Sequence, residues 1–331
     1  MKTTSRSLTT ILLFLCFAGC ATVNIQARLN VARDAKTSTA ERIQAVQDLV
    51  RSDKEKPLIN RALQSLLEVD NPQVAWHAKR GLRVVRGQDK VDFSRVAVVG
   101  ASVSAGFGST PFHRIFKGAI EVPTRIHNQS TPMFFISATT IGKRSIRTAV
   151  AFRATVVVAV DFLFWYVYVR GTTAYRSQRL AQALTLLEQV KAPLFLGDIP
   201  HLKIMPIMVK PEQIPSRQEI AQFNAQVHQW ARRRLNVEII PIAQWSAPLR
   251  TGACAPLAPS LPPVRARKLM NRDGLHPNRI GSRYLIRKIA ALIYHAYPST
   301  LPGAIKVPVT LGKKLPYCPS AHLIQRRKRT I

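Results

Sequence analysis

The chain has 331 residues, of which 47% are apolar, so it can bury a sizeable core and is not a globally disordered protein. Its 49 Lys and Arg residues against 17 Asp and Glu residues give a formal net charge of +32 at pH 7. Such a charge fits binding to anionic lipid, polysaccharide or nucleic acid, but the basic residues are spread along the chain, which favours a generally basic surface. The dense basic run is confined to residues 326–329, and no zinc-finger, RNA-recognition or basic-zipper pattern is present, so nucleic acid is not an expected partner.

The first twenty residues have the pattern of an export signal. Lys2 and Arg6 precede an apolar stretch at residues 8–18, which is too short to span a membrane as a stable helix. Ala18-Gly19-Cys20 resembles the end of a bacterial lipobox, with Phe17 where leucine is usual. The segment therefore predicts a signal peptide over residues 1–19 and a lipoprotein anchored to the membrane through lipidated Cys20; an ordinary secretory signal cut nearby is the alternative.

Cysteine usage agrees with export to the bacterial cell envelope. Cys16 would be removed with the signal peptide. The mature chain would then contain Cys254 and Cys318 in addition to the lipidated Cys20. In an oxidising periplasm these two could form one disulfide, and two unpaired thiols are the equal alternative. By resemblance to bacterial lipoproteins, Ala21 after the cysteine favours the outer membrane or periplasm over the inner membrane.

A short helical module is expected after a polar tether at residues 20–37. Ser38-Thr39-Ala40-Glu41 fits a capping box, and apolar residues then recur at helical spacing in three runs up to Val85. The stretch 70–85 is similar to one HEAT-type repeat, but one or two such units cannot bury a continuous core. Residues 38–90 therefore predict a small module packed on the next domain or on a partner, with a plain helical linker favoured over a repeat array.

Strand and helix patterns alternate over residues 93–297. The expected strands are at 96–99, 134–136, 154–160, 194–197 and 237–240, and the expected helices at about 176–190, 217–235 and 281–296. This alternation predicts an α/β fold, a flavodoxin-like three-layer α/β/α arrangement around a parallel sheet, whose sites lie at the carboxyl ends of the strands. Residues 247–268 read as a loop, and residues 298–331 as a poorly ordered basic, Pro-rich tail, with contact to an anionic membrane or glycan as the weaker reading.

Two motifs carry the candidate chemistry. The first runs from Gly100 to Gly106 and places Ser102 on a glycine-flanked turn directly after the strand at 96–99. The second is Asp273-Gly274-Leu275-His276, just before an apolar helical stretch. A hydrolase with a serine nucleophile needs histidine as general base and aspartate to fix its tautomer and stabilise the imidazolium, so the sequence predicts Ser102, Asp273 and His276 as catalytic residues.

The two motifs, in this order, resemble those of SGNH (GDSL-type) hydrolases over roughly residues 93–297. That family carries its serine after the first strand in a GDSxxxG-like block, where this chain has Ala101 instead of Asp, and its Asp-x-x-His pair in the last block. The resemblance implies an SGNH hydrolase-like fold and an esterase, lipase or O-acetyl esterase that works without a cofactor or metal. The implied partner is an ester-bearing small molecule, lipid or glycan.

The resemblance is weaker for the oxyanion hole, whose donors in that family are the serine amide, a glycine amide and an asparagine side chain. Ser102 supplies the first, Gly142 (or Gly118) is the candidate for the second, and Asp161 stands where the asparagine is expected. An ionised carboxylate cannot donate, although a protonated one could in a dry pocket; a structural acid paired with an arginine is the other reading. The alternative function is therefore an SGNH-fold envelope protein with weakened catalysis and a binding or assembly role.

Two further groups lie near the expected site. Phe162, Phe164 and Trp165 are expected in the core or in a pocket wall, and Asp198 to His201 at a strand end fits a turn better than a cleft wall. No Cys/His cluster has metal-ligand spacing.

Overall fold

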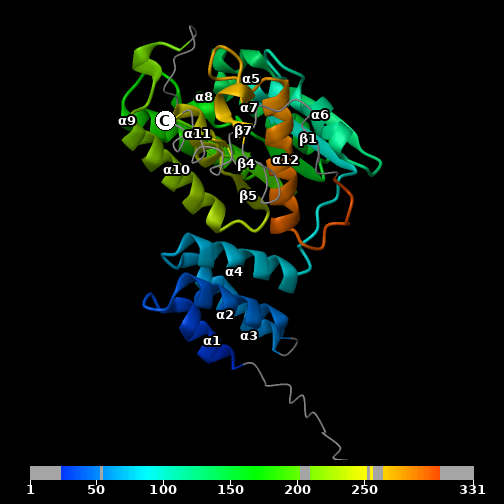
Figure 1. Cartoon of the computed structure of the whole chain (residues 1–331), viewed down its shortest axis with the longest axis vertical. Helices are drawn as coiled ribbons and strands as arrows, with labels where there is room; N and C mark the ends of the chain where they lie inside the picture. The colour runs from blue at the N-terminus through cyan, green and yellow to red at the C-terminus, as the bar shows by residue number, and fades with distance from the viewer. Residues whose placement is uncertain (1–23, 53–54, 202–208, 252–253, 256–263, 306–331) are drawn as a thin grey trace, which may run out of the picture.

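The computed structural model describes residues 24–52, 55–201, 209–251, 254–255 and 264–305 (Figure 1). An all-helical part at the N-terminus precedes an α/β part. None of the helices within these described ranges is long and apolar enough to cross a membrane.

The helical part consists of α1 (Ile25–Arg33), α2 (Thr39–Arg51), α3 (Lys56–Ser65), a 3-10 turn at Leu66–Glu68, and α4 (Pro72–Val85). The expected capping box is confirmed: the Ser38 hydroxyl accepts from the amide of Glu41, whose carboxylate accepts from the Ser38 amide. Asn71 caps α4 through its side-chain oxygen, which accepts from the amides of Gln73 and Val74, and proline follows at the first position of the helix. Leucine and other apolar side chains of all four helices pack into a core of their own.

The α/β part is built on a parallel sheet. Its strands are β1 (Arg95–Gly100), β2 (Arg125–Ser130), β3 (Val156–Ala159), β4 (Leu194–Gly197) and β5 (Val237–Ile240). Within the described residues they pair in the order β2-β1-β3-β4-β5, every neighbour parallel. This is the order of a flavodoxin-like sheet, and it confirms the predicted α/β fold with a parallel sheet. The central strands β3 and β4 are buried along their whole length, because helices cover both faces of the sheet.

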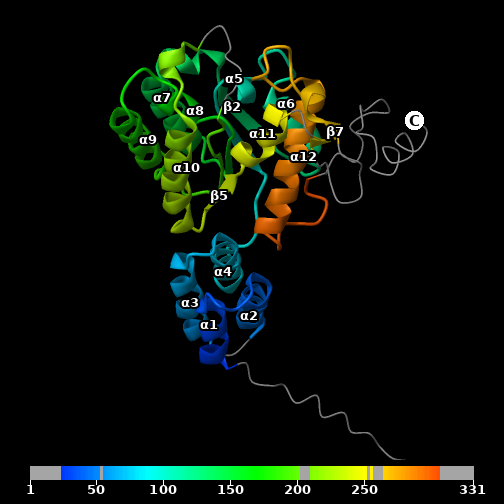
Figure 2. The ribbon, with the colours of Figure 1, turned by 60° about the vertical axis from the view of Figure 1, so that its left-hand side comes forward.

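The helices divide between the two faces of the sheet (Figure 2). Side chains of α7 (Ala138–Ala151), α8 (Phe164–Val167), α9 (Thr173–Leu187) and α10 (Arg217–Arg232) share one core with alternate residues of the strands. Side chains of α6 (Phe112–Ala119), α11 (Ile242–Thr251) and α12 (Arg279–Ala296) pack with the other alternate residues. The short helix α5 (Ser102–Ala105) follows β1 at the carboxyl edge of the sheet.

One predicted strand is wrong. Residues 134–136 belong to a 3-10 helix, Pro132–Ile136, and the edge strand of the sheet is β2 at Arg125–Ser130. The polar sequence of β2 gave no strand pattern because an edge strand is only partly buried. Phe134, which suggested a strand, is instead buried edge-on against the rings of Phe162 and Tyr166.

Two segments differ from the expected loop and tail. Residues 247–268 begin inside α11 and include a short antiparallel pair, β6 (Cys254–Ala255) with β7 (Val264–Arg265), and a 3-10 turn at Ala266–Leu269. Residues 298–305 pack on the domain: Ala304 and Ile305 are buried, and the Tyr294 hydroxyl donates to the Ile305 carbonyl at 3.0 Å. The rest of the expected tail lies outside the described residues.

Helix α4 is the helix of the helical part that lies next to the α/β part (Figure 1), and a buried polar cluster joins the two. Arg83 pairs with Glu238 at 2.8 Å, with both side chains almost fully buried, and Trp76 Nε1 donates to the same carboxylate at 2.6 Å. Lys79 Nζ donates to the carbonyls of Ala231 and Val237 at 2.8 and 2.5 Å. These bonds fix α4 against the start of β5 and the end of α10.

Candidate active site

Two glycines shape the turn that carries Ser102. Gly100 ends β1 with φ of 152°, and a Cβ there would lie 2.4 Å from Asp161 Oδ1 and 2.6 Å from Ser104 Oγ. Gly106 ends α5 in the left-handed region at φ of 78°, where a Cβ would lie 2.4 Å from the backbone of Pro111. Both positions therefore require glycine for steric reasons. Ser102, between them, is the first residue of α5.

Asp161 holds this turn from the neighbouring strand. It follows β3, and its Oδ1 accepts from the Ala101 amide at 2.9 Å and the Ser104 hydroxyl at 2.6 Å. Its Oδ2 accepts from the Val103 amide at 2.8 Å and more distantly from the Ser104 amide at 3.4 Å. Burial raises the pKa of Asp161 above its usual value, while the four donors oppose this rise. The structure thus places Asp161 as an acceptor that fixes the serine turn, although the sequence suggested it as an oxyanion donor.

The second motif brings an imidazole to Ser102 from 174 residues away. His276 Nε2 lies 2.9 Å from Ser102 Oγ, and His276 Nδ1 lies 2.8 Å from Asp273 Oδ2. The other oxygen of Asp273 accepts from the amides of Leu275 and His276, each at 2.9 Å. Gly274, at φ of 67°, permits the tight turn between the two residues. Serine, imidazole and carboxylate therefore form one continuous hydrogen-bonded chain, in the arrangement that activates a serine.

The surroundings keep the imidazole oriented. Burial alone would raise the pKa of Asp273, but the His276 amide, the imidazole and the Leu275 amide together hold this pKa below its usual value. Asp273 is thus an anion at neutral pH and favours a proton on Nδ1, which leaves Nε2 free to accept the serine proton. The ring of Phe107 lies 4.9 Å from the imidazole, centroid to centroid, and covers part of it.

A pocket of about 170 Å³ opens beside Ser102. Its wall is mostly apolar and combines residues of α5, α8, α11 and α12 with the segment around His276. The largest side chains in the wall are Phe164, Trp165, Trp245, Met270 and Tyr284. Such a pocket suits an uncharged, apolar part of a ligand whose reacting group lies at the serine.

Most of this wall could not be found from the sequence. Trp245 and Tyr284 lie on helices and Met270 directly follows a 3-10 turn, and nothing in the sequence around them separates them from core residues. Trp165 was expected in the core or a pocket wall and lines the pocket. Asp198 and His201 also line it, and Asp198 accepts from the Ala243 amide at 2.7 Å and lies 3.4 Å from His228 Nε2.

The glycine candidates lie elsewhere. Gly142 is buried inside α7, where a Cβ would lie 2.2 Å from the Tyr166 hydroxyl oxygen, so its lack of a side chain makes room for Tyr166. Gly118 lies in α6, where a Cβ would meet open space. Neither glycine lines the pocket beside Ser102.

The structure describes one of the three cysteines for which a role was predicted. Cys254 lies in β6 and is disulfide-bonded, but Cys318 lies outside the described residues, so their pairing stays a prediction. Cys20 also lies outside the described residues, and lipidation stays a prediction. Within the described ranges, no group of three or more His, Cys, Asp or Glu residues could hold a metal ion.

The sequence matches no protein-family model and no curated protein. Similar solved structures include the psychrotrophic esterase EstA from Pseudoalteromonas sp., with 12% identity, a TM-score of 0.41, and coverage of 61% of this chain and 97% of the esterase. A gut microbial diltiazem-metabolizing enzyme is 13% identical, with a TM-score of 0.43 and coverage of 61% of this chain and 47% of the enzyme. Because both TM-scores are below 0.5, neither likeness assigns a family or an activity to this chain.

Proposed function

We propose that the chain is a serine hydrolase of SGNH type that cleaves an ester through Ser102, His276 and Asp273. The observation that carries the proposal is the hydrogen-bonded chain from Ser102 Oγ through both imidazole nitrogens to Asp273, at 2.9 and 2.8 Å. Ser102 lines an apolar pocket, where an acyl or alkoxy group of the substrate would lie.

The reaction follows from this geometry. Ser102 Oγ attacks the ester carbonyl carbon while His276 Nε2 takes the hydroxyl proton, and Asp273 stabilises the imidazolium that forms. The tetrahedral oxyanion collapses, the C–O bond to the alcohol breaks, and the imidazolium gives its proton to the leaving alkoxide. A water then attacks the acyl-enzyme with His276 again as base, which releases the carboxylic acid and restores Ser102.

Hydrolysis of p-nitrophenyl butyrate by the purified protein tests this proposal. Ser102→Ala and His276→Ala should each lower kcat by at least about 10³-fold, and Asp273→Asn by about 10⁴-fold, because the imidazole then takes the wrong tautomer. His228, whose Nε2 lies 3.4 Å from Asp198, offers a matched control outside this chain of bonds. His228→Ala should keep wild-type kcat. Activity that survives Ser102→Ala would remove the proposed mechanism.

A second candidate function is an SGNH-fold envelope protein with weakened catalysis and a binding or assembly role. The observation that favours it is Asp161, whose two oxygens both accept hydrogen bonds where the resemblance implies an amide donor. A well-folded protein with no turnover of any p-nitrophenyl ester, together with tight binding of an envelope component, would support this candidate over the hydrolase.

For the cellular site, we propose export and anchoring through Cys20 in the bacterial envelope, with the outer membrane or periplasm as the destination. The support is the segment Lys2 to Cys20, with its charged start, short apolar stretch and lipobox-like end. Metabolic labelling with a palmitate analogue should mark the full chain, and Cys20→Ala should abolish the label. A label that persists in Cys20→Ala would contradict lipidation at this residue.

A further inference from the structure

Trp165 carries a buried hydrogen-bond donor for which the described residues provide no acceptor. The side chain is only 8% exposed, and its Nε1 has no hydrogen-bond partner among the described residues. Two other tryptophans show the usual outcome: Trp76 Nε1 donates to Glu238 at 2.6 Å, and Trp230 Nε1 to Glu188 at 3.3 Å. Buried indole N–H groups usually find a partner, so an unpartnered one on a residue that lines a pocket is a candidate donor to a ligand.

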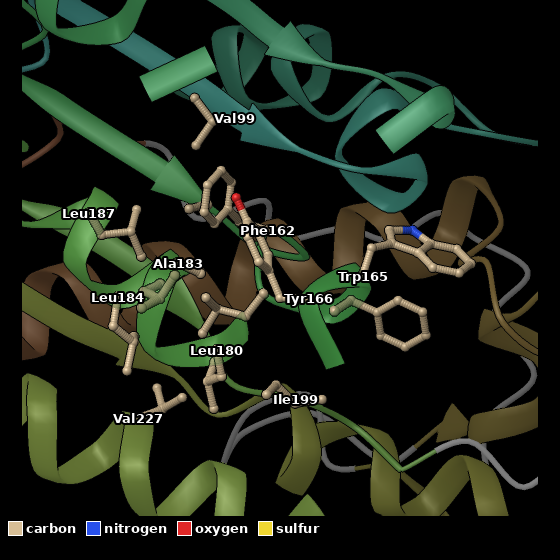
Figure 3. Close-up of a cluster of buried hydrophobic side chains, with 14 of the residues drawn as sticks. Val99, Phe162, Trp165, Tyr166, Leu180, Ala183, Leu184, Leu187, Ile199 and Val227 are labelled. Atoms are coloured by element: carbon tan, nitrogen blue, oxygen red, sulfur yellow. The ribbon is translucent and has the colours of Figure 1, made fainter. Parts of the chain in front are cut away.

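The position of Trp165 makes the ligand of the pocket the natural acceptor. Trp165 and Ser102 line the same pocket. Figure 3 shows Trp165 at one end of the buried cluster, apart from Phe162 and Tyr166. Trp165 and Ser102 therefore belong to one site.

The ring is held in place by its neighbours. Phe164 packs edge-on against Trp165, with ring centroids 5.0 Å apart and an interplanar angle of 85°, and Phe135 packs on it at 5.7 Å. The helix α8 that carries the ring starts three residues after Asp161, which is itself fixed by the serine turn. Because Nε1 is itself buried, an acceptor in the pocket reaches the N–H after a small shift of the ring or of its neighbours.

The pocket has a use for such a donor. Asp161, at the position where the resemblance implies an amide, presents two acceptor oxygens that are already occupied by amides and by the Ser104 hydroxyl. An ester entering an apolar pocket must lose water from its oxygens, and that loss is costly unless a protein donor replaces the water. The indole N–H is suited to this replacement because it donates and never accepts.

We propose that Trp165 Nε1 donates a hydrogen bond to an oxygen of the bound ester and thereby positions it against Ser102. This inference rests on the proposed hydrolase function for the identity of the acceptor. It assigns the substrate class as uncharged esters with an apolar group, because the wall of the pocket is mostly apolar.

The direct test is the indole N–H spectrum of the full chain carrying Ser102→Ala, which binds an ester without cleaving it. The four tryptophans give four indole signals, which single Trp→Phe variants assign. Methyl hexanoate should shift the Trp165 signal downfield, whereas 1-chloroheptane, which has no carbonyl, should not. Trp245, in the same pocket wall, reports occupancy with both ligands, and Trp76 and Trp230 should stay unchanged.

Two results would overturn the proposal: an ester that shifts Trp245 but leaves Trp165 in place, and an ester that shifts neither signal up to its solubility limit. Labelling of wild-type Ser102 by a fluorophosphonate distinguishes a failure of the donor proposal from a failure of the proposed hydrolase function. Labelling without a Trp165 shift removes the donor and leaves the hydrolase, whereas a Trp165 shift without labelling leaves the donor and removes the hydrolase.

An isosteric variant gives a kinetic test. Replacing Trp165 by β-(3-benzothienyl)alanine keeps the ring shape and exchanges the N–H for sulfur. The expected result is a loss of kcat/KM of about tenfold or more on p-nitrophenyl butyrate, at an unchanged melting temperature. The same replacement at Trp230, which lies outside the pocket, should change kcat/KM by less than about twofold. Wild-type kcat/KM in the Trp165 variant would contradict the role of the donor.

Discussion

The hydroxyl of Ser104 donates a hydrogen bond of 2.6 Å to Oδ1 of Asp161, within the turn that presents Ser102. The amides of Ala101 and Val103, on either side of Ser102, donate to the same carboxylate. The acid after β3 thus clamps the turn after β1, the strand next to it in the sheet. Ala101 itself offers no side-chain acceptor, so the carboxylate that ties this turn comes from Asp161.

Asp161→Asn tests this clamp. An asparagine must turn its NH₂ group toward donors on one side, so at least one amide or the Ser104 hydroxyl loses its acceptor. We expect the free energy of unfolding to fall by about 1–3 kcal/mol and kcat on p-nitrophenyl butyrate to fall about tenfold or more. Ser104→Ala, which removes only the hydroxyl, is the milder control. An Asp161→Asn variant more active than wild type would show instead that position 161 serves the oxyanion, as the family resemblance implies.

The apolar pocket predicts a change of chain-length preference. Ile242 lines the pocket from the start of α11 and also packs in the sheet core. Ile242→Trp should fill part of the pocket and lower kcat/KM for p-nitrophenyl hexanoate at least tenfold, while p-nitrophenyl acetate is cleaved at a near wild-type rate. The acetate rate serves as the control for folding. Equal losses on both esters would mean that the pocket does not hold the acyl chain.

The sequence predicted the elements with strong patterns and missed those with weak ones. The β-branched run of β3 and the leucine-rich β4 read clearly as strands, because both lie in the sheet interior. Strand β2 was missed, since an edge strand carries polar residues, and the aromatic 3-10 turn at Pro132–Ile136 was taken in its place.

The residues of the candidate site also divide into those that the sequence predicted and those that it did not. Ser102, Asp273 and His276 could be named because their turns require glycines and fixed spacing, and the structure brings the three side chains into one hydrogen-bonded chain. The function of Asp161 could not be predicted, because most of its partners are backbone amides, which leave no mark in a sequence. The unpaired donor of Trp165 was equally hidden, since it depends on which polar groups happen to lie near the ring.

The buried pair Arg83–Glu238 predicts that α4 is essential to the stability of the α/β part. Arg83→Met leaves the Glu238 carboxylate buried without its cation, so we expect the free energy of unfolding in urea to fall by about 3–5 kcal/mol. Arg83→Met with Glu238→Leu should recover part of this loss. Arg233 and Glu68 offer a matched exposed pair, with side chains 63% and 53% exposed, and Arg233→Met should cost less than about 1 kcal/mol. Similar costs for both single variants would contradict a special role for the buried pair.

Lys79 predicts a rise of stability with pH. Burial lowers the pKa of Lys79 to about 7, although nearby Glu238 opposes the shift. Between pH 7 and 9 the unfolded chain therefore binds a proton that the folded protein lacks, and the free energy of unfolding rises with pH by up to about 1.4 kcal/mol per pH unit. Lys79→Met removes this contribution, so the difference between wild type and variant should change over this window. A constant difference from pH 7 to 9 would show that Lys79 keeps its proton when the protein is folded.

Labelling with a fluorescent fluorophosphonate measures most directly whether Ser102 is an activated nucleophile. The full chain should be labelled on Ser102, with the site located by peptide mass. Ser102→Ala should abolish the label, and His276→Ala should reduce its rate at least about 10³-fold, because the imidazole that takes the serine proton is lost. A folded wild-type protein that stays unlabelled, or one whose label persists in Ser102→Ala, would contradict the account.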